Sequence, residues 1–129
     1  MRRYAFRGTA ISKVTVPAKV NSCNYYSVFS DCSNLTEVTF ARGMETIPNY
    51  VCQGMDYLNK VYIPSSVTRI NKYAINECSR LKYVVFEGTK SEWNKIENNC
   101  DLSQAQMIYQ GKIPASELKL STTKKAYRS

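Results

Sequence analysis

The strongest constraint on this chain is a hydrophobic pattern that repeats every 23 residues. Five columns of residues keep this step: Leu35, Leu58 and Leu81; Val38, Val61 and Val84; Phe40, Ile63 and Phe86; Ile47, Ile70 and Trp93; and Cys32, Met55 and Cys78. A unit of this size cannot bury its own apolar face, so neighbouring units must stack around one continuous core. The period therefore predicts a solenoid, a fold that usually offers a binding surface rather than a pocket for chemistry.

The repeat extends upstream with one inserted residue. The stretch Ile11, Val14, Val16, Pro17 and Val20 matches Leu58, Val61, Ile63, Pro64 and Val67 at an offset of 47, which is one more than two periods. A second motif precedes each leucine, as Tyr4-Ala5-Phe6, Ser27-Val28-Phe29, Tyr50-Val51-Cys52 and Tyr73-Ala74-Ile75. We expect this motif to form a turn opposite the strands, with its third residue packed into the core.

Each unit contains a short alternation of apolar and polar residues that predicts a strand. Val61 and Ile63 flank Tyr62, and Pro64 then ends the strand because it has no N–H to donate. Stacked units place these strands side by side, about 4.8 Å apart, in one parallel sheet.

The last unit reads differently from the others. Thr89 and Glu92 have the spacing of a capping box, which predicts a helix of about two turns with Trp93 and Ile96 on its inner face. Residues 105–109 then read as a final strand that ends at Gly111. A polar end unit with a helix would cover the open core of a solenoid.

These units resemble the BspA-like leucine-rich repeats. The resemblance is carried by Cys32-Ser-Asn-Leu35-Thr-Glu-Val38, by Leu58-Asn-Lys-Val61-Tyr-Ile63-Pro64-Ser-Ser-Val67-Thr-Arg-Ile70 and by Phe86-Glu-Gly-Thr89-Lys-Ser-Glu92-Trp93-Asn-Lys-Ile96. It covers about residues 4–111 and implies a short right-handed leucine-rich-repeat solenoid of about four units, with a parallel β-sheet and a helical C-terminal cap. We divide the chain into repeats over residues 1–86, a capping unit over 87–111 and a basic tail over 112–129.

The composition argues against catalysis. The chain has no histidine, which removes histidine-based triads and histidine-ligated metals, and its five glycines form no phosphate-binding loop. No C-x-x-C pair is present, and the cysteine spacings fit no zinc pattern. Because Cys23, Cys32, Cys52 and Cys78 occupy repeat columns, we expect them to be small buried hydrophobes, whereas Cys100 falls outside the columns. We predict a protein that is not an enzyme and has no metal or cofactor.

The net charge of +8 is concentrated at the two ends. Residues 1–30 carry five bases and no acid, residues 31–111 are nearly neutral, and residues 112–129 carry five bases against one acid. We refer to these residues as the basic arms: Arg2, Arg3, Arg7, Lys119, Lys124, Lys125 and Arg128. Such arms either keep a small domain soluble or attract an acidic partner, including nucleic acid, although no aromatic-basic groove motif accompanies them.

The candidate binding site is the outward face of the strands. If Val61 and Ile63 point inward, the outward positions of three successive strands are Glu37, Thr39, Lys60, Tyr62, Tyr83 and Val85. Tyr62, Tyr83 and Val85 would form an apolar-aromatic patch beside Lys60, and exposed tyrosine is well suited to an interface. The alternative is that residues favouring β-structure simply populate an exposed sheet.

Together these features predict a protein–protein interaction module. One version is a structural or accessory subunit of a larger assembly, such as a phage virion protein, which would self-associate through an uncapped N-terminal end. Another is a fragment of a bacterial surface or secreted adhesin, which the resemblance implies, and a third is nucleic-acid association through the arms. No apolar run is long enough to span a membrane, and no secretory signal is recognisable, so we expect a cytoplasmic or virion location, or the cell surface if the chain belongs to a longer exported protein.

Overall fold

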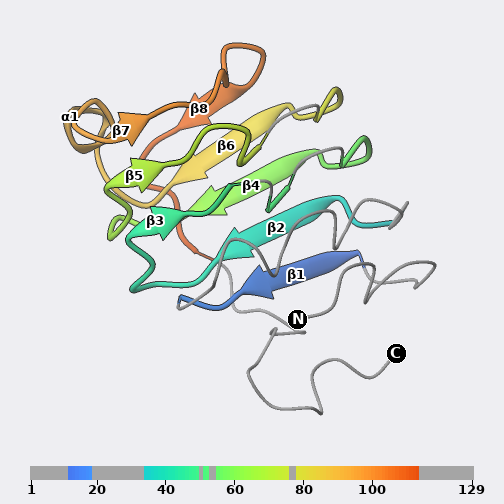
Figure 1. Cartoon of the computed structure of the whole chain (residues 1–129), viewed down its shortest axis with the longest axis horizontal. Coiled ribbons are helices and arrows are strands. Elements are labelled where there is room, and N and C mark those ends of the chain that lie inside the picture. Colours follow the sequence, from blue (N-terminus) through green and yellow to red (C-terminus); the bar gives the residue numbers. More distant parts are fainter. Residues whose placement is uncertain (1–11, 19–33, 50, 53–54, 76–77, 114–129) are drawn as a thin grey trace.

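The computed structural model describes residues 12–18, 34–49, 51–52, 55–75 and 78–113 as a solenoid of parallel strands with one short helix. In chain order its elements are β1 (Lys13–Val16), β2 (Glu37–Phe40), β3 (Thr46–Ile47), β4 (Lys60–Ile63), β5 (Arg69–Ile70), β6 (Tyr83–Phe86), α1 (Lys90–Trp93), β7 (Glu97–Asn98) and β8 (Gln106–Ile108). The strands climb regularly from β1 to β8, as Figure 1 shows. The basic arms lie outside the described residues, and so do Tyr4-Ala5-Phe6, Ile11, Val20 and Ser27-Val28-Phe29 of the predicted motifs.

The main sheet has five parallel strands in the order β1-β2-β4-β6-β8. Val38 pairs with Val61, and Val61 pairs with Val84, so the 23-residue columns become rows across the sheet. Val14 pairs with Val38, 24 residues later, which confirms the single inserted residue. The predicted last strand is also confirmed, because Met107 lies opposite Val84.

A second parallel sheet, in the order β3-β5-β7, corrects the prediction of a single sheet. Its strands are only two residues long, which is too short for an alternating pattern to be recognised in the sequence. Ile47 pairs with Ile70 as the columns predict, but Ile70 then pairs with Asn98 rather than Trp93. The segment that contains α1 makes the last unit longer than 23 residues, so the residue opposite Ile70 is Asn98 and not the residue 23 positions later.

The core lies between the two sheets and contains the predicted columns. Leu58, Val61 and Ile63 are all completely buried. The described part of the turn motif also packs inward: Val51, Cys52, Ala74 and Ile75 are buried, whereas Tyr73 faces outward. Cys52 and Cys78 are buried as expected of small hydrophobes, while Cys23 and Cys32 lie outside the described residues.

The capping unit keeps the predicted capping box but has a shorter helix. The Thr89 hydroxyl accepts a hydrogen bond from the Glu92 N–H, and the Glu92 carboxylate accepts one from the Thr89 N–H. The helix spans four residues rather than two turns because Asn94 caps it and the following chain joins the second sheet as β7. The Trp93 ring packs edge-on against Phe86, with ring centroids 5.2 Å apart, and so covers the end of the core.

Candidate functional site

The structure brings together three of the predicted site residues on the outer face of the main sheet. Tyr62 and Tyr83 lie on the neighbouring strands β4 and β6, because Lys60 pairs with Tyr83 and Tyr62 pairs with Val85. The Lys60 ammonium lies 5.6 Å from the centre of the Tyr62 ring and 5.7 Å from that of Tyr83. All three side chains are half-buried, so one side of each still faces solvent. We call Lys60, Tyr62 and Tyr83 the strand-face patch.

Two predicted members of this face are buried instead of exposed. Thr39 and Val85 are each only 6% exposed, although both point away from the core. Val85 is covered by the chain that follows β8: a Cβ added to Gly111 would clash with Val85 Cγ1, and the Gly111 N–H donates to the Phe86 carbonyl. The prediction that Val85 contributes an apolar contact surface is therefore wrong, because the C-terminal unit folds back over it.

Glu37 remains on the outer face but is already paired. Its carboxylate lies 3.5 Å from the Lys13 ammonium on the neighbouring strand β1. Lys60, on the other side of Glu37 in the same row, lies over the tyrosine rings instead. The outer face thus changes from charge pairing at β1 and β2 to an aromatic-cationic surface at β4 and β6.

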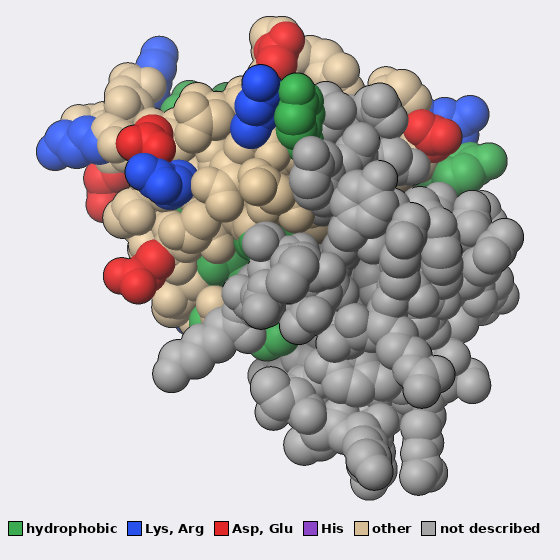
Figure 2. Space-filling view, viewed as in Figure 1, with side chains coloured by type: hydrophobic (Ala, Val, Ile, Leu, Met, Phe, Trp, Pro, Cys, Tyr) green, Lys and Arg blue, Asp and Glu red, His purple; other side chains and the backbone are tan. Residues whose placement is uncertain are grey.

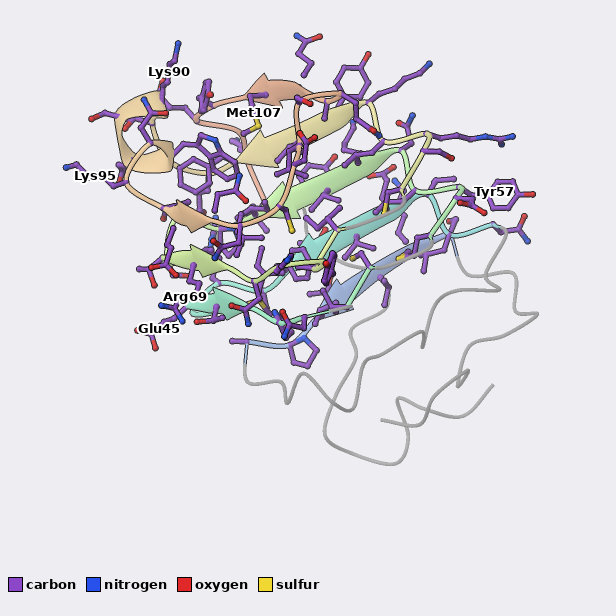
Figure 3. All side chains as sticks on the ribbon, turned by 45° about the horizontal axis from the view of Figure 1, so that its top comes forward. Glu45, Tyr57, Arg69, Lys90, Lys95 and Met107 are labelled. Atoms are coloured by element: carbon purple, nitrogen blue, oxygen red, sulfur yellow. The ribbon has the colours of Figure 1, made fainter. Side chains whose placement is uncertain are left out.

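A groove that the sequence did not predict lies where the strands begin. It has a volume of about 730 Å³ and is lined by turn residues that precede the strands, among them Tyr57 and Arg80. The Arg80 guanidinium lies 4.9 Å from the centre of the Tyr57 ring, which is 45% exposed. Tyr57 projects from this end of the molecule in Figure 3. The sequence signal is the 23-residue spacing of these two residues, each just before a core leucine. We call this feature the entry groove.

The opposite end of the strands carries a network of hydrogen bonds between units. The Glu87 carboxylate accepts hydrogen bonds from the Ser65 N–H at 3.0 Å and from the Ser65 hydroxyl at 3.1 Å, and Arg42 Nε donates to it at 2.7 Å. Partial burial raises the pKa of the Glu87 carboxyl, but the hydrogen bonds from Ser65 and Arg42 outweigh it, so the pKa is lowered overall. We call Arg42, Ser65 and Glu87 the exit network.

Charges at this exit end neutralise one another. Arg69 Nε lies 2.7 Å from a Glu97 carboxylate oxygen on the adjacent strand of the second sheet. Figure 2 shows acidic and basic side chains intermixed over the described part of the face that carries β3, β5 and α1. The exit end therefore offers no strong field of one sign to a charged partner.

The buried cysteines are poor candidates for nucleophilic chemistry. Burial, followed by the proximity of Cys78 and Cys100, raises the pKa of the Cys52 thiol, whereas a reactive cysteine needs a lowered pKa. Cys100, half-buried, donates from Sγ to the Asn71 carbonyl at 3.0 Å. Within the described ranges, no cluster of three potential metal ligands occurs. No helix among the same residues is long and apolar enough to cross a membrane.

Comparison with known proteins agrees with this architecture. Residues 1–121 match the BspA type leucine-rich repeat region, in six copies. A crystal structure of a leucine-rich cell surface protein from Faecalibacterium prausnitzii superposes with a TM-score of 0.54 and 25% sequence identity, covering 75% of this chain and 32% of that one. The chain thus spans about a third of the length of that solved structure. The search of curated proteins found no match.

The parallel-strand solenoid and its capping unit define a leucine-rich-repeat protein. Because the family match extends over nearly all of the sequence, the chain belongs to the BspA-type leucine-rich repeat family. Proteins built from such repeats typically act through extended binding surfaces rather than through catalytic pockets.

Proposed function

We propose that this chain is a non-catalytic interaction module that binds a protein partner through the strand-face patch. The observation that carries the proposal is the placement of Tyr62 and Tyr83 on adjacent strands with the Lys60 ammonium over both rings. Tyrosine offers a large, stiff contact area with a polar tip, and such residues supply much of the affinity of protein interfaces. Their half-exposed rings stand on a rigid sheet, so binding would require little ordering of the site.

An adhesin-like role at a cell surface is the version that we favour. The solved structure with the same fold is described as a leucine-rich cell surface protein, and this chain corresponds to about a third of it. Repeats of this kind would then form the part of a longer protein that contacts the partner.

A subunit of a larger assembly, for example a virion protein, is the second candidate. It is favoured by one feature of the sheet: among the described strands, β1 has a neighbour only on the side of β2. An edge strand of this kind is a template for pairing with another chain. Molar mass by light scattering after size exclusion, at low and high salt, tests it: a stable oligomer supports the assembly subunit, and a monomer throughout argues against it.

The test of the strand-face patch is a pair of matched tyrosine variants. Tyr62→Ala combined with Tyr83→Ala should leave folding intact and abolish partner binding. Tyr73→Ala removes an exposed tyrosine from the turn between β5 and β6, outside the strand-face patch, and should leave binding intact. A partner is first identified by crosslinking to the wild-type chain and is then purified. Its affinity for the wild type and for each variant is measured. Equal binding by all three proteins would remove the strand-face patch from the interface.

A further inference from the structure

The entry groove crosses four successive strands of the main sheet. Thr36 precedes β2, Asn59 precedes β4, Lys82 precedes β6 and Gln104 precedes β8, and all four residues line it. With strands about 4.8 Å apart, the groove is about 14 Å long, which matches roughly four residues of extended peptide. Its dimensions therefore suit a segment of chain that runs across the coils.

The entry groove is basic and has no acidic wall. Arg80 and Lys82 line it, both are exposed, and none of its lining residues is acidic. Lys60 immediately follows Asn59, so the strand-face patch adjoins the groove and adds a third cation. Two acids also flank the groove, Glu37 beside Thr36 and Asp56 beside Tyr57. The Glu37 carboxylate is paired with Lys13, so the cations at the groove outnumber the unpaired acid. In this stretch the surface therefore favours carboxylates, although residues 31–111 as a whole are nearly neutral.

The cations of this surface differ from those that pair with carboxylates on neighbouring strands or units. Lys13, Arg42 and Arg69 each contact a carboxylate within 4 Å. Lys60 and Arg80 instead lie over tyrosine rings, and within the residues that the structure describes neither they nor Lys82 form an ion pair. Outside this surface, Lys72 also lies over a ring, 5.0 Å from the centre of Tyr73. A cation held over a ring keeps its N–H donors free for an incoming anion.

We propose that the entry groove binds an acidic, extended segment of a protein partner, whose carboxylates contact Arg80 and Lys82, with Lys60 beside them, while Tyr57 packs against the chain between them. The proposal rests on the interaction function proposed above and names the chemistry of its partner. A peptide fits better than a nucleic acid because the cluster has only three cations over a short groove, whereas nucleic-acid grooves track a long backbone with many cations.

The test is the binding of a fluorescein-labelled hexaglutamate peptide to the full chain, measured by fluorescence anisotropy at low salt. Wild type should bind hexaglutamate and should not bind the neutral hexaglutamine peptide. Arg80→Gln with Lys82→Gln should weaken hexaglutamate binding by about tenfold or more, because two charge-assisted contacts are lost. Lys90→Gln with Lys95→Gln removes the same charge from the far end of the molecule, where Figure 3 places both residues, and should change binding by less than about twofold.

Binding of other polyanions, measured in the same way, distinguishes an acidic peptide from nucleic acid and heparin. A single-stranded DNA or a heparin oligosaccharide of equal charge should bind the groove variant as well as it binds wild type. The proposal is overturned if the groove variant keeps full hexaglutamate affinity, if both double variants lose it equally, or if the groove variant loses DNA or heparin binding more than peptide binding.

The same variants separate this proposal from the proposed function. If the tyrosine variant of the strand-face patch still binds the protein partner while the groove variant does not, the patch is excluded and the groove survives. If the groove variant binds hexaglutamate normally while the tyrosine variant loses the partner, the interaction function survives and the acidic segment is excluded.

Discussion

The exit network and the entry groove use arginine in opposite ways. At the exit end, Arg42 donates to Glu87, and Glu87 also accepts from the Ser65 N–H and hydroxyl on the adjoining unit. At the entry end, Arg80 lies over Tyr57 and faces solvent. Figure 3 shows the separation: Tyr57 projects at one end, while Arg69, Lys90 and Lys95 lie at the other.

From this difference we infer that the exit network holds the units together and that the entry groove is available to a partner. A carboxylate that joins two units contributes to stability, because its removal leaves donors without acceptors. A cation that contacts only an exposed ring contributes little to stability but keeps its charge for binding. The predictions below test this division, beginning with the core that both ends share.

Leu58→Ala should have the largest effect on stability. Leu58 is completely buried in the middle unit, and truncation of a buried leucine costs about 2–5 kcal/mol of unfolding free energy. Urea denaturation followed by circular dichroism measures it. A loss below about 1 kcal/mol would contradict the continuous core between the sheets.

Gly111→Ala should destabilise the chain by about 1–3 kcal/mol because the added methyl group overlaps Val85 on the outer face. The effect should shrink when Val85→Ala is added, because that change removes the overlapping methyl group. A double-mutant cycle from denaturation curves gives the coupling between the two positions. Strict additivity would show that the C-terminal unit does not cover Val85.

Glu87→Gln should cost about 1 kcal/mol of stability at neutral pH, because the charge-assisted hydrogen bonds from Arg42 and Ser65 are weakened at a carboxylate that is partly exposed. Glu45→Gln is the matched control, because Glu45 is exposed and its side chain forms no hydrogen bond within the described residues. Equal stability of the two variants would remove the exit network from the account.

The same carboxylate predicts a dependence on pH. Because its pKa is lower in the folded chain than in the unfolded chain, the contribution of Glu87 is complete above its ordinary pKa. The contribution is lost as the pH falls through the lowered value. The stability difference between wild type and Glu87→Gln, measured from pH 7 to pH 3, should therefore shrink at the acidic end, and a constant difference would contradict this assignment.

Arg80→Gln with Lys82→Gln should have the smallest effect on stability, within about 0.5 kcal/mol, because both side chains are exposed and unpaired with any carboxylate in the described part of the chain. Thermal unfolding by circular dichroism measures it. A loss comparable to that of Glu87→Gln would mean that the entry groove is structural.

Much of the fold could be predicted from the sequence because the core repeats. Val38, Val61 and Val84 align in one row, and the inserted residue between the first units appears in the pairing of Val14 with Val38. The second sheet was missed because a two-residue strand such as Arg69–Ile70 has no period of its own. Trp93 was misplaced because a helical segment breaks the 23-residue step there.

The candidate site was predicted less completely, because exposure depends on segments distant in sequence. Alternation placed Lys60, Tyr62 and Tyr83 on one face, and the structure agrees. It could not show that the chain near Gly111 returns over Val85. The entry groove lies in turns, where hydrophobic periodicity carries no information about which side chains meet.

The central claim is tested most directly by two matched variants, Arg42→Gln and Arg80→Gln, each measured for unfolding free energy and for hexaglutamate binding. The account predicts that Arg42→Gln loses stability and keeps binding, because its partner is Glu87, and that Arg80→Gln keeps stability and loses binding. The account would be contradicted if Arg42→Gln weakened binding as much as Arg80→Gln, or if Arg80→Gln were the more destabilising of the two.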